Sequence, residues 1–314
     1  MADEQLTILY IINPDPIFYG MMDQLIIETF QRHKVNVIVT ELEELSFIVG
    51  NEITFYRKGE QIQFDAFLGY GYMAPKHNQD YMYFTFAVHS AGKITLHKPE
   101  TEEILQNKLL QYLKFSENQV PIPRSGTSFS VNTFKQNLRR FNNKSIMKEV
   151  VGYEGTGVKL SVNHNQSTEL FCKSIWNGEQ TIIQDFIDDT IGRSIRVLVI
   201  GGKAVSVTEF QDNVDFKSNA QSDDFTIESK MDSDKKNEYF KIAEKACAAI
   251  DPHLTIGGVD ILDSRKNGIV ILEINSWPEI TFSQDATGLP LFDQFGQEFI
   301  EKIITNIRER KNSA

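Results

Sequence analysis

The sequence contains few cysteines. Only Cys172 and Cys247 occur in 314 residues, far apart and outside any Cys-x-x-Cys pattern. Such isolated cysteines predict reduced, mostly buried thiols and no disulfide framework. Reduced thiols suit a reducing compartment, so we expect a cytoplasmic protein.

Positive charge and long apolar runs are also scarce. With 32 Lys and Arg against 43 Asp and Glu, the formal net charge is −11. A nucleic-acid backbone usually selects a basic face, so we expect no nucleic-acid partner, although a local basic pocket for a small anion is not excluded. No apolar stretch approaches the length of a membrane span, and acids stand where a signal peptide needs basic residues. We therefore expect a soluble protein with no membrane partner.

The patterns of several common catalytic sites are missing as well. The sequence has no GK[ST] phosphate loop, its six histidines show no ligand-like pairing, and no nucleophile motif surrounds a Ser or His. These absences argue against a Walker-type site and against covalent catalysis by the protein.

The order of predicted elements indicates an α/β protein. A chain of 314 residues suggests two or three packed units. The apolar run 6–12, the helical spacing of 21–33 and the strand 35–40 predict an α/β unit with a largely parallel sheet. A hairpin over 52–64, turning at Lys58-Gly59, and a strand over 65–71 follow.

From about residue 101 the pattern changes. Thr101 is the predicted N-cap of a helix over 101–115, and a proline-rich link follows at 120–127. The polar segment 211–234 lacks clear periodicity and is predicted as a loop or flap. The other predicted elements are strands over 144–152, 157–162, 180–187, 194–210 (two strands joined at Gly201-Gly202) and 257–275 (two strands), and helices over 235–250 and 291–310.

Two carboxylates and an amide interrupt the apolar hairpin 257–275. If Asn267-Gly268 forms a two-residue turn, Asp260 lies opposite Asn275, with Glu273 two residues away on the same face. A four-residue loop shifts the pairing but keeps the same three residues on one face, whereas a three- or five-residue loop does not. Carboxylates this close repel unless protonated or bridged by a cation, and oxygen donors without His or Cys suit Mg²⁺. A solvent-facing edge strand is the alternative.

A glycine-rich turn follows the strand that begins near 144. Gly152, Gly155 and Gly157 give a flexible turn whose backbone N–H groups can approach a phosphate, although a plain hairpin explains them equally well. Lys148 lies four residues before these glycines, from where its ammonium group can reach the same phosphate.

Two further basic residues have ambiguous positions. Lys108 lies beside the apolar side of its predicted helix, near Leu105 and Tyr112, as either a snorkelling lysine or a phosphate-binding one. Arg196 alternates with aliphatic residues, so it either clamps a phosphate or carboxylate or forms a surface salt bridge.

Taken in order, these features resemble the ATP-grasp superfamily, and most closely its RimK-like carboxylate–amine ligases. The resemblance extends from "KLLQYL" at 108 to "TG" at 287–288, and more faintly through the N-terminal unit. The segments that carry it are "MKEVVGYEGTGVKL", "IIQDFI", "SIRVLVIGGKAV", "DFKSN", "GGVDIL" and "LEINSWP".

The resemblance implies an α/β protein with α+β lobes and the ATP-grasp fold. In this fold an N-terminal α/β (pre-ATP-grasp) domain precedes two lobes that enclose ATP. We expect this domain over 1–100, a central lobe with the glycine-rich loop over 101–187, and a C-terminal lobe with the metal site over 188–314.

The same resemblance implies roles for individual residues. Lys108 and Lys148 match two nucleotide-binding lysines, and Arg196 matches an arginine near the phosphates and substrate. Arg196, Lys148 and Asn275 are the predicted catalytic residues. Asp260, Glu273 and Asn275 match the Mg²⁺ ligands. The other matches are the glycine-rich loop (Gly152, Gly155, Thr156, Gly157), the hinge whose backbone contacts adenine (Gln184, Asp185, Phe186, Ile187), and an asparagine facing the active site (Asn219).

The implied reaction joins a small-molecule or peptide carboxylate to an amine, with ATP and Mg²⁺ or Mn²⁺. The carboxylate takes the γ-phosphate to give an acyl phosphate and ADP, and the amine then displaces phosphate. RimK-like enzymes often form dimers or tetramers, so a homo-oligomer is one of the states that the sequence leaves open. Two alternatives stay open: an ATP-grasp kinase acting on a small-molecule hydroxyl, and a nucleotide-binding regulator with little turnover.

The chain departs from the family pattern on the substrate side. Ser194 stands where RimK-like enzymes usually have Asp, and Glu279 where they have Gly. "EFQDNV" at 209–214 replaces a run that usually carries basic residues, and "AQSDD" at 220–224 replaces His-Arg-Gly-Gly. The reduced positive charge argues against a glutamate or acidic peptide substrate, and it leaves the acid and the amine unidentified.

Overall fold

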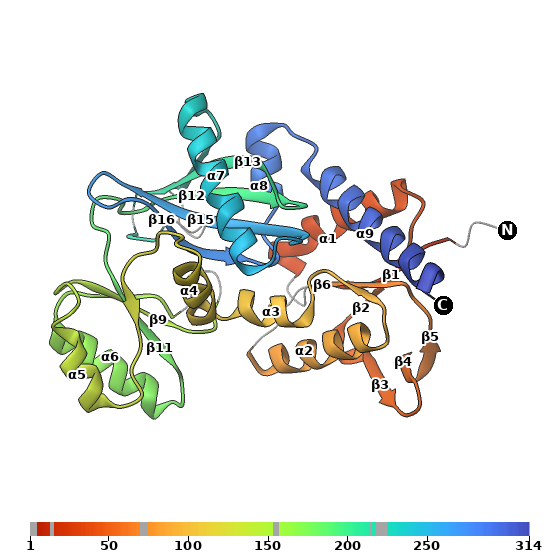
Figure 1. Cartoon of the computed structure of the whole chain (residues 1–314), viewed down its shortest axis with the longest axis horizontal. Coiled ribbons are helices and arrows are strands. Elements are labelled where there is room, and N and C mark those ends of the chain that lie inside the picture. Colours follow the sequence, from red (N-terminus) through yellow and green to blue (C-terminus); the bar gives the residue numbers. More distant parts are fainter. Residues whose placement is uncertain are drawn as a thin grey trace.

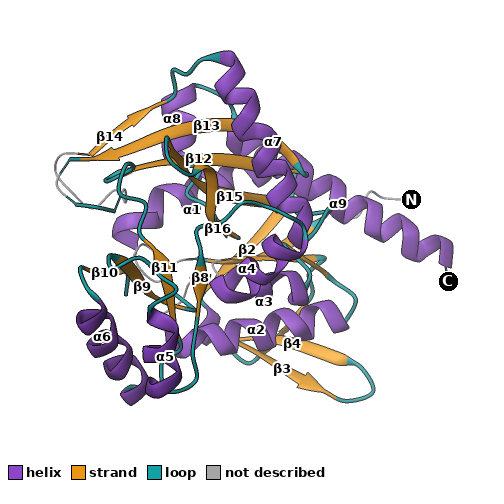
Figure 2. Ribbon diagram, turned by 60° about the vertical axis from the view of Figure 1, so that its left-hand side comes forward, coloured by secondary structure: helices purple, strands orange, loops and turns teal. Residues whose placement is uncertain are grey.

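The computed structural model describes residues 5–12, 16–69, 75–152, 157–213, 215–217 and 225–313. Figure 1 shows the N-terminal elements at the right, a smaller lobe with α5 (Val131–Leu138) and α6 (His164–Trp176) at the lower left, and the C-terminal sheet above them. Figure 2 shows helices and strands mixed in every part of the molecule, as expected for an α/β protein.

The N-terminal unit is built on a parallel sheet, as predicted. β1 (Thr7–Ile11) is apolar after Thr7, and Ile8 to Ile11 have no exposed surface, because the strand is covered on both faces. Two helices, α1 (Pro16–Arg32) and α2 (Pro75–Ser90), belong to this unit. The strand order is β2 (Asn36–Thr40), β1 (Thr7–Ile11), β6 (Ala66–Gly69) and β7 (Ile94–Thr95), and all neighbours are parallel.

The predicted hairpin at Lys58-Gly59 is confirmed and belongs to a separate small sheet. Lys58 and Gly59 have φ angles of 50° and 83°, the left-handed pair that a two-residue hairpin turn requires. The order of this antiparallel sheet is β3 (Leu45–Val49), β4 (Ile53–Arg57) and β5 (Glu60–Ile62), and the short helix η1 (Leu42–Glu44) precedes it.

The lobe at the lower left is an antiparallel sheet with helices on one face. Met147 and Ile183 pack against Phe134 of α5 and Phe171 of α6, whose rings stack with centroids 3.9 Å apart. Lys148 and Gln184 alternate with these residues and point to the other face. The sequence analysis did not predict the two helices. The strand order is β10 (Lys159–Ser161), β9 (Ser145–Glu149), β11 (Thr181–Asp185) and β8 (Ser125–Gly126).

The single helix predicted over 101–115 is two helices, α3 (Pro99–Gln106) and α4 (Lys108–Glu117). Asn107 separates them because its backbone is extended and its Oδ1 accepts a hydrogen bond from the Leu110 N–H, at 3.0 Å. Thr101 is not an N-cap, since it lies inside α3 and its hydroxyl donates to Asp251 at 2.8 Å. The break places Lys108 at the first position of α4.

The C-terminal unit is a five-stranded antiparallel sheet. The hairpin at Gly201-Gly202 is confirmed, and β14 lies inside the segment that was predicted as a loop or flap. Helix α7 (Ser233–Ile250) and α4 cover one face with aliphatic and aromatic side chains, and α8 (Thr281–Thr287) follows the last strand. The strand order is β14 (Phe225–Glu228), β13 (Lys203–Asp212), β12 (Arg193–Ile200), β15 (Ile256–Ser264) and β16 (Gly268–Asn275).

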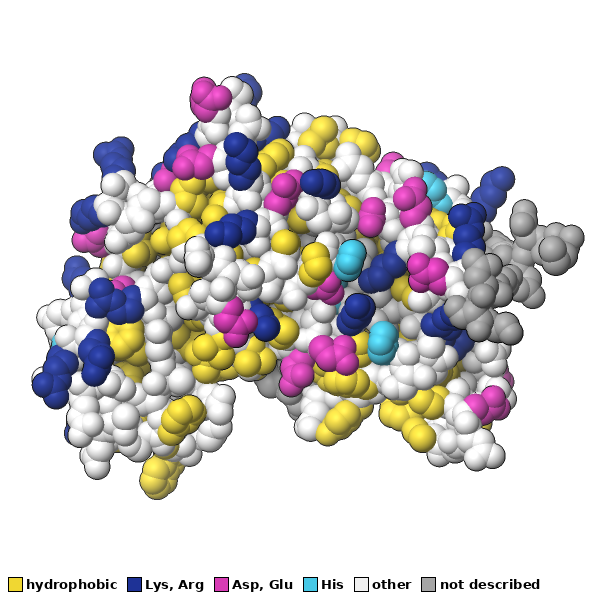
Figure 3. Space-filling model, in the orientation of Figure 1, with side chains coloured by type: hydrophobic (Ala, Val, Ile, Leu, Met, Phe, Trp, Pro, Cys, Tyr) yellow, Lys and Arg dark blue, Asp and Glu magenta, His cyan; other side chains and the backbone are white. Residues whose placement is uncertain are grey.

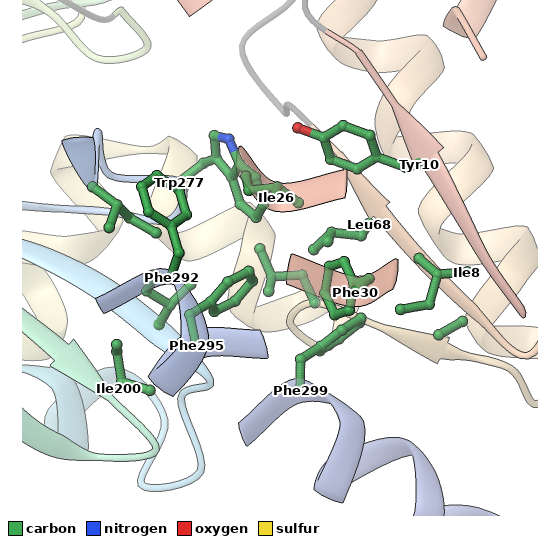
Figure 4. Packing of buried hydrophobic residues seen from close by; sticks show 14 of the residues in the cluster. Ile8, Tyr10, Ile26, Phe30, Leu68, Ile200, Trp277, Phe292, Phe295 and Phe299 are labelled. Carbon is green, nitrogen blue, oxygen red and sulfur yellow. The ribbon is translucent and has the colours of Figure 1, made fainter. Parts of the chain in front are cut away.

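The C-terminal helix α9 (Leu291–Ser313) connects the first and last parts of the chain. Phe295 and Phe299 approach Phe30 of α1 edge-on, with ring centroids 6.3 and 6.1 Å away. Figure 4 shows these rings between Ile8 and Leu68 of the parallel sheet on one side and Trp277 and Ile200 on the other. A single core cluster therefore includes residues from both ends of the sequence.

Two sequence predictions about solubility and thiols can be compared with the structure. No helix within the described part of the chain is both long and apolar enough to cross a membrane. Both cysteines are free; the prediction of burial is right for Cys247 and wrong for Cys172, which is exposed on α6.

We expect Phe299→Ala to lower the free energy of unfolding by about 3–5 kcal/mol, because it removes a fully buried ring at the junction of α1 and α9. Urea denaturation would measure the loss. The control is Phe129→Ala, which truncates a ring that is 89% exposed and should change stability by less than about 0.5 kcal/mol. Equal effects of the two substitutions would contradict this account of the core.

Candidate functional site

Polar side chains from three separate parts of the chain meet beside β16. Lys108 comes from α4, Lys148 from β9, and Arg196 from β12. Asp260 lies on β15, and Glu273 and Asn275 lie on β16. Buried apolar residues on either side of these positions anchor the strands in the sheet, so the polar residues are carried on rigid elements.

The hairpin that carries the acids does not have the predicted register. Its turn is three residues long, 265–267, so that Ser264 pairs with Gly268. The Ser264 hydroxyl stabilises this turn by accepting hydrogen bonds from the backbone N–H groups of Lys266 and Asn267, at 3.1 and 2.9 Å. Gly268 follows with φ 71°, as expected for three-residue hairpin loops.

A β-bulge at Leu272 compensates for the odd turn. The register shifts between Asp260 and Ile261, so Asp260 pairs directly with Glu273 and Gly258 pairs with Asn275. One extra residue reverses the faces of all later side chains. The three oxygen-bearing side chains therefore share a face, as predicted, although the predicted opposition of Asp260 and Asn275 is wrong.

The side chains are close enough to interact directly. The Arg196 guanidinium donates to both oxygens of Asp260, at 2.6 and 2.8 Å. The Asn275 amide donates to Asp260 Oδ2 at 3.0 Å, and Lys108 Nζ lies 3.2 Å from Glu273 Oε2. Gly258 makes room for this packing, because a Cβ there would lie 2.5 Å from Pro278 and 3.2 Å from the Arg196 side chain.

The two carboxyl groups differ in their electrostatic environment. Burial alone would raise the pKa of Glu273, but the nearby ammonium groups of Lys108 and Lys148 hold that pKa below its ordinary value. Burial raises the pKa of Asp260 despite its contact with Arg196. The site thus contains two acids whose repulsion is offset by three cationic side chains.

Lys148 is held by neutral partners. Its ammonium group donates to the Tyr112 hydroxyl and to Gln184 Oε1, the latter at 3.1 Å. The Gln184 amide in turn donates to Tyr112 at 3.1 Å and to Ser125 at 2.8 Å. Burial lowers the pKa of Lys148 to about 8, because few charges compensate for its loss of hydration.

The rest of the predicted hinge lies beyond Gln184. The Asp185 carboxylate points away from Lys148 and accepts a hydrogen bond from the Asn142 N–H at 2.9 Å. The Phe186 ring meets Phe216 edge-on, with centroids 6.3 Å apart, and Ile187 is buried.

The predicted glycine-rich loop is described at its two ends. The Gly152 carbonyl accepts a hydrogen bond from Lys108 Nζ, which brings this loop to the acids. Gly157 has φ 75°, and a Cβ there would lie 2.4 Å from Glu149 Oε1. Gly155 and Thr156 lie outside the described residues, as does Asn219.

The donor set suits an oxygen-preferring divalent cation. No group of three His, Cys, Asp and Glu residues in the described ranges is arranged to hold a metal. Two carboxylates and one amide nevertheless lie together, and Mg²⁺ commonly binds one or two carboxylates together with substrate phosphates. Lys108 and Arg196 occupy the carboxylate oxygens and would have to move as a metal approached.

Sequence comparison identifies the family. The profile of the RimK-like ATP-grasp domain matches residues 105–298. The chain belongs to this family. The RimK-like match begins in α3 and ends in α9, so it contains every described residue of the site.

Named RimK-like relatives and solved structures agree with this match. A "Probable alpha-L-glutamate ligase" of Histophilus somni is 25% identical over 193 residues, covering 59% of this chain and 60% of the relative. One of Coxiella burnetii is 27% identical over 256 residues, covering 81% and 74%. The chain thus spans 60% of the length of the first relative.

The structural matches show that the whole described fold is of the ATP-grasp type. A RimK domain protein from Sphaerobacter thermophilus superposes with a TM-score of 0.71 at 14% identity, over 93% of this chain and 98% of that one. The ATP-grasp ligase PsnB, solved with a minimal precursor, Mg and ADP, gives 0.66 at 16% identity, over 95% and 96%.

A cavity of about 210 Å³ lies elsewhere, on the opposite face of the β9–β11 sheet. It is lined by Phe134, Leu138, Phe141 and Ile183, and Arg140 is at its border. The segment 118–148 around it contains Lys and Arg but no acid, and Figure 3 shows dark-blue side chains over this left-hand lobe. This cavity contributes nothing to the cluster around Asp260.

Sequence reasoning did not assign a role to Gln111, and it treated Tyr112 only as an apolar neighbour of Lys108. Both are buried on α4 against β16 and the site lysines. The sequence feature that could have drawn attention to Gln111 is its position as a polar residue on the buried side of an amphipathic helix.

We expect Lys148 to make a contribution to the free energy of unfolding that rises between about pH 8 and pH 10.5. Its folded-state pKa of about 8 lies below its ordinary value of 10.5, so in this interval Lys148 binds more protons in the unfolded chain than in the folded one. Lys148→Met should reduce this rise by up to about 3 kcal/mol. Urea denaturation at pH 7.5 and 10 measures the effect.

The matched control is Lys173→Met, which removes an exposed lysine on α6. This substitution should leave the pH dependence of stability unchanged. A Lys148→Met variant with the wild-type pH dependence would show that Lys148 is not held in a desolvated position.

Proposed function

We propose that this protein is an ATP- and Mg²⁺-dependent ligase that joins a carboxylate to an amine through an acyl phosphate. The observation that carries the proposal is the cluster of Lys108, Lys148 and Arg196 around Asp260 and Glu273. Such a cluster, in a RimK-like ATP-grasp domain, matches the needs of phosphoryl transfer, which depends on positioning and charge neutralisation.

Lys108 and Lys148 would bind the nucleotide phosphates, together with the glycine-rich loop from Gly152 to Gly157. The hinge from Gln184 to Ile187 and Asn219 would contact the rest of the nucleotide. Asp260, Glu273 and Asn275 would hold the metal. When bound, Mg²⁺ or Mn²⁺ would offset the negative charge of the phosphates and of the attacking carboxylate.

Arg196 would orient the substrate carboxylate, because its forked donors already bind a carboxylate, that of Asp260. A carboxylate oxygen then attacks the γ-phosphorus, and the bond to the bridging oxygen breaks to release ADP. The amine nitrogen attacks the acyl carbon, phosphate leaves, and the amine loses a proton. No side chain of the protein forms a covalent bond.

The names of related proteins support this reaction type. Curated relatives are named probable alpha-L-glutamate ligases, and PsnB is an ATP-grasp ligase crystallised with Mg and ADP. PsnB was also solved with a precursor peptide, so a peptide is one class of substrate to test besides small carboxylates and amines. The scarcity of basic residues at 209–214 favours an acid other than glutamate.

We also propose the domain division 1–100, 101–187 and 188–314. The three main sheets fall within these ranges, which supports the division. Helix α9 packs onto α1, so the first and third domains would move together rather than separately.

We expect Glu273→Gln to abolish Mg²⁺-dependent ADP formation while the protein stays folded, because the amide keeps the shape but loses the charge. The assay supplies Mg-ATP and a metabolite extract and identifies the products by mass spectrometry. Glu169→Gln, an exposed carboxylate on α6, is the control and should react as wild type does.

The products distinguish the candidate activities. ADP, phosphate and a new amide establish the ligase and identify both substrates. ADP with a new phosphate ester would instead establish a kinase. Normal ATP turnover by Glu273→Gln would show that the metal assignment is wrong, and no ADP from the wild type would favour a regulator.

A further inference from the structure

The outer edge of β16 has no neighbouring strand in the described sheet, and α4 lies along it. An uncovered edge leaves backbone N–H and C=O groups without ladder partners. Figure 2 shows α4 close to β16. At Ile274 a side chain of α4, rather than a strand, satisfies the backbone groups of this edge.

Gln111 pairs with the backbone of Ile274 as a neighbouring strand would. Its Oε1 accepts from the Ile274 N–H at 2.7 Å, and its Nε2 donates to the Ile274 carbonyl at 3.0 Å. Nε2 donates its second hydrogen to the Leu105 carbonyl, at a distance of 2.7 Å. Gln111 is 1% exposed, so an unmatched group at this position would be costly. Ile274 is the residue between Glu273 and Asn275.

Tyr112 holds the bulge in the same way. Its hydroxyl donates to the carbonyl of Leu272, the inserted residue, at 2.9 Å. Lys148 and Gln184 donate to the same oxygen, so both the proton and the acceptor capacity of the hydroxyl are used. Burial raises the pKa of Tyr112, which keeps the donated proton in place.

The support continues on both sides of these contacts. Before the bulge, the Ile271 N–H donates to the Pro121 carbonyl at 2.8 Å. After Asn275, the Ser276 hydroxyl donates to Glu102 of α3 at 2.9 Å. The strand from 271 to 276 is therefore fixed at its outer edge by α3, α4 and the segment that follows α4.

We propose that Gln111 and Tyr112 are positioning residues that set the relative placement of Glu273 and Asn275 for metal binding. Lys108, one turn earlier on the same helix, contacts Glu273, so α4 couples a nucleotide-binding residue to the metal-binding strand. This inference rests on the proposed function. Gln111 acts through the backbone of β16, and Tyr112 acts both through that backbone and through Lys148.

The test measures how strongly Mg²⁺ tightens the binding of AMP-PNP, a non-hydrolysable ATP analogue. Calorimetric titrations with Mg²⁺ and with EDTA give the two affinities, and their ratio is the metal coupling. We expect Gln111→Leu to reduce this ratio about tenfold, as is typical when a partner that orients a ligand is lost. Its affinity in EDTA should change less than twofold.

Phe115→Leu is the matched control. Phe115 is fully buried on the same helix but has no hydrogen bond to β16, so it should lower stability without changing the metal coupling. Urea denaturation of both variants shows whether the losses of stability are comparable. Equal reductions of the coupling in both variants would assign Gln111 a merely structural role and overturn the proposal.

Two further variants distinguish failure of the positioning role from failure of the proposed function. Glu273→Gln should abolish the coupling; if the wild type shows no coupling, the proposed function itself fails. Coupling that is lost in Glu273→Gln but intact in Gln111→Leu overturns the positioning role alone. If Gln111→Leu does not fold, Tyr112→Phe decides. It keeps the ring and removes the hydroxyl that bonds Leu272, Lys148 and Gln184; unchanged coupling there overturns the proposal.

Discussion

The repulsion between Asp260 and Glu273 is the constraint on which the site depends. Two buried carboxylates on paired strands are unstable unless cations compensate them. Arg196 comes from the same sheet, but Lys108 comes from α4 and Lys148 from the smaller lobe. Electrostatic compensation therefore requires separate parts of the chain to meet, and any ligand that brings its own charge changes this balance.

The hydrophobic packing makes this meeting reproducible. Helix α9 returns to α1, and the rings of Phe30, Phe295 and Phe299 join the parallel sheet to the end of the five-stranded sheet. On the other face of that sheet, α4 and α7 form a second core with the inner strands. The acids thus lie between two well-packed regions, although the site itself is polar.

Most residues that meet in the cluster around Asp260 could be singled out from the sequence, because they contradict their surroundings. Charged residues inside apolar strands, such as Lys148 and Glu273, are visible without a structure. The register was not predictable from Asn267-Gly268, because the hydrogen bonds of Ser264 select a three-residue turn. Helices α5 and α6 were missed because each is amphipathic over only a few turns. Gln111 was missed because its partner is backbone, which leaves no complementary residue in the sequence.

The bulge at Leu272 imposes a parity rule on this hairpin. Side chains alternate along a strand, so only the combined count of turn and bulge residues decides which face Glu273 and Asn275 occupy. The turn contributes three residues, which is an odd number, and the one extra residue of the bulge makes the total even. A single insertion or deletion in either place would turn both side chains toward α7, whereas paired changes would keep them beside Asp260. Variation in the length of this hairpin should therefore occur in steps of two, or as simultaneous changes at both positions.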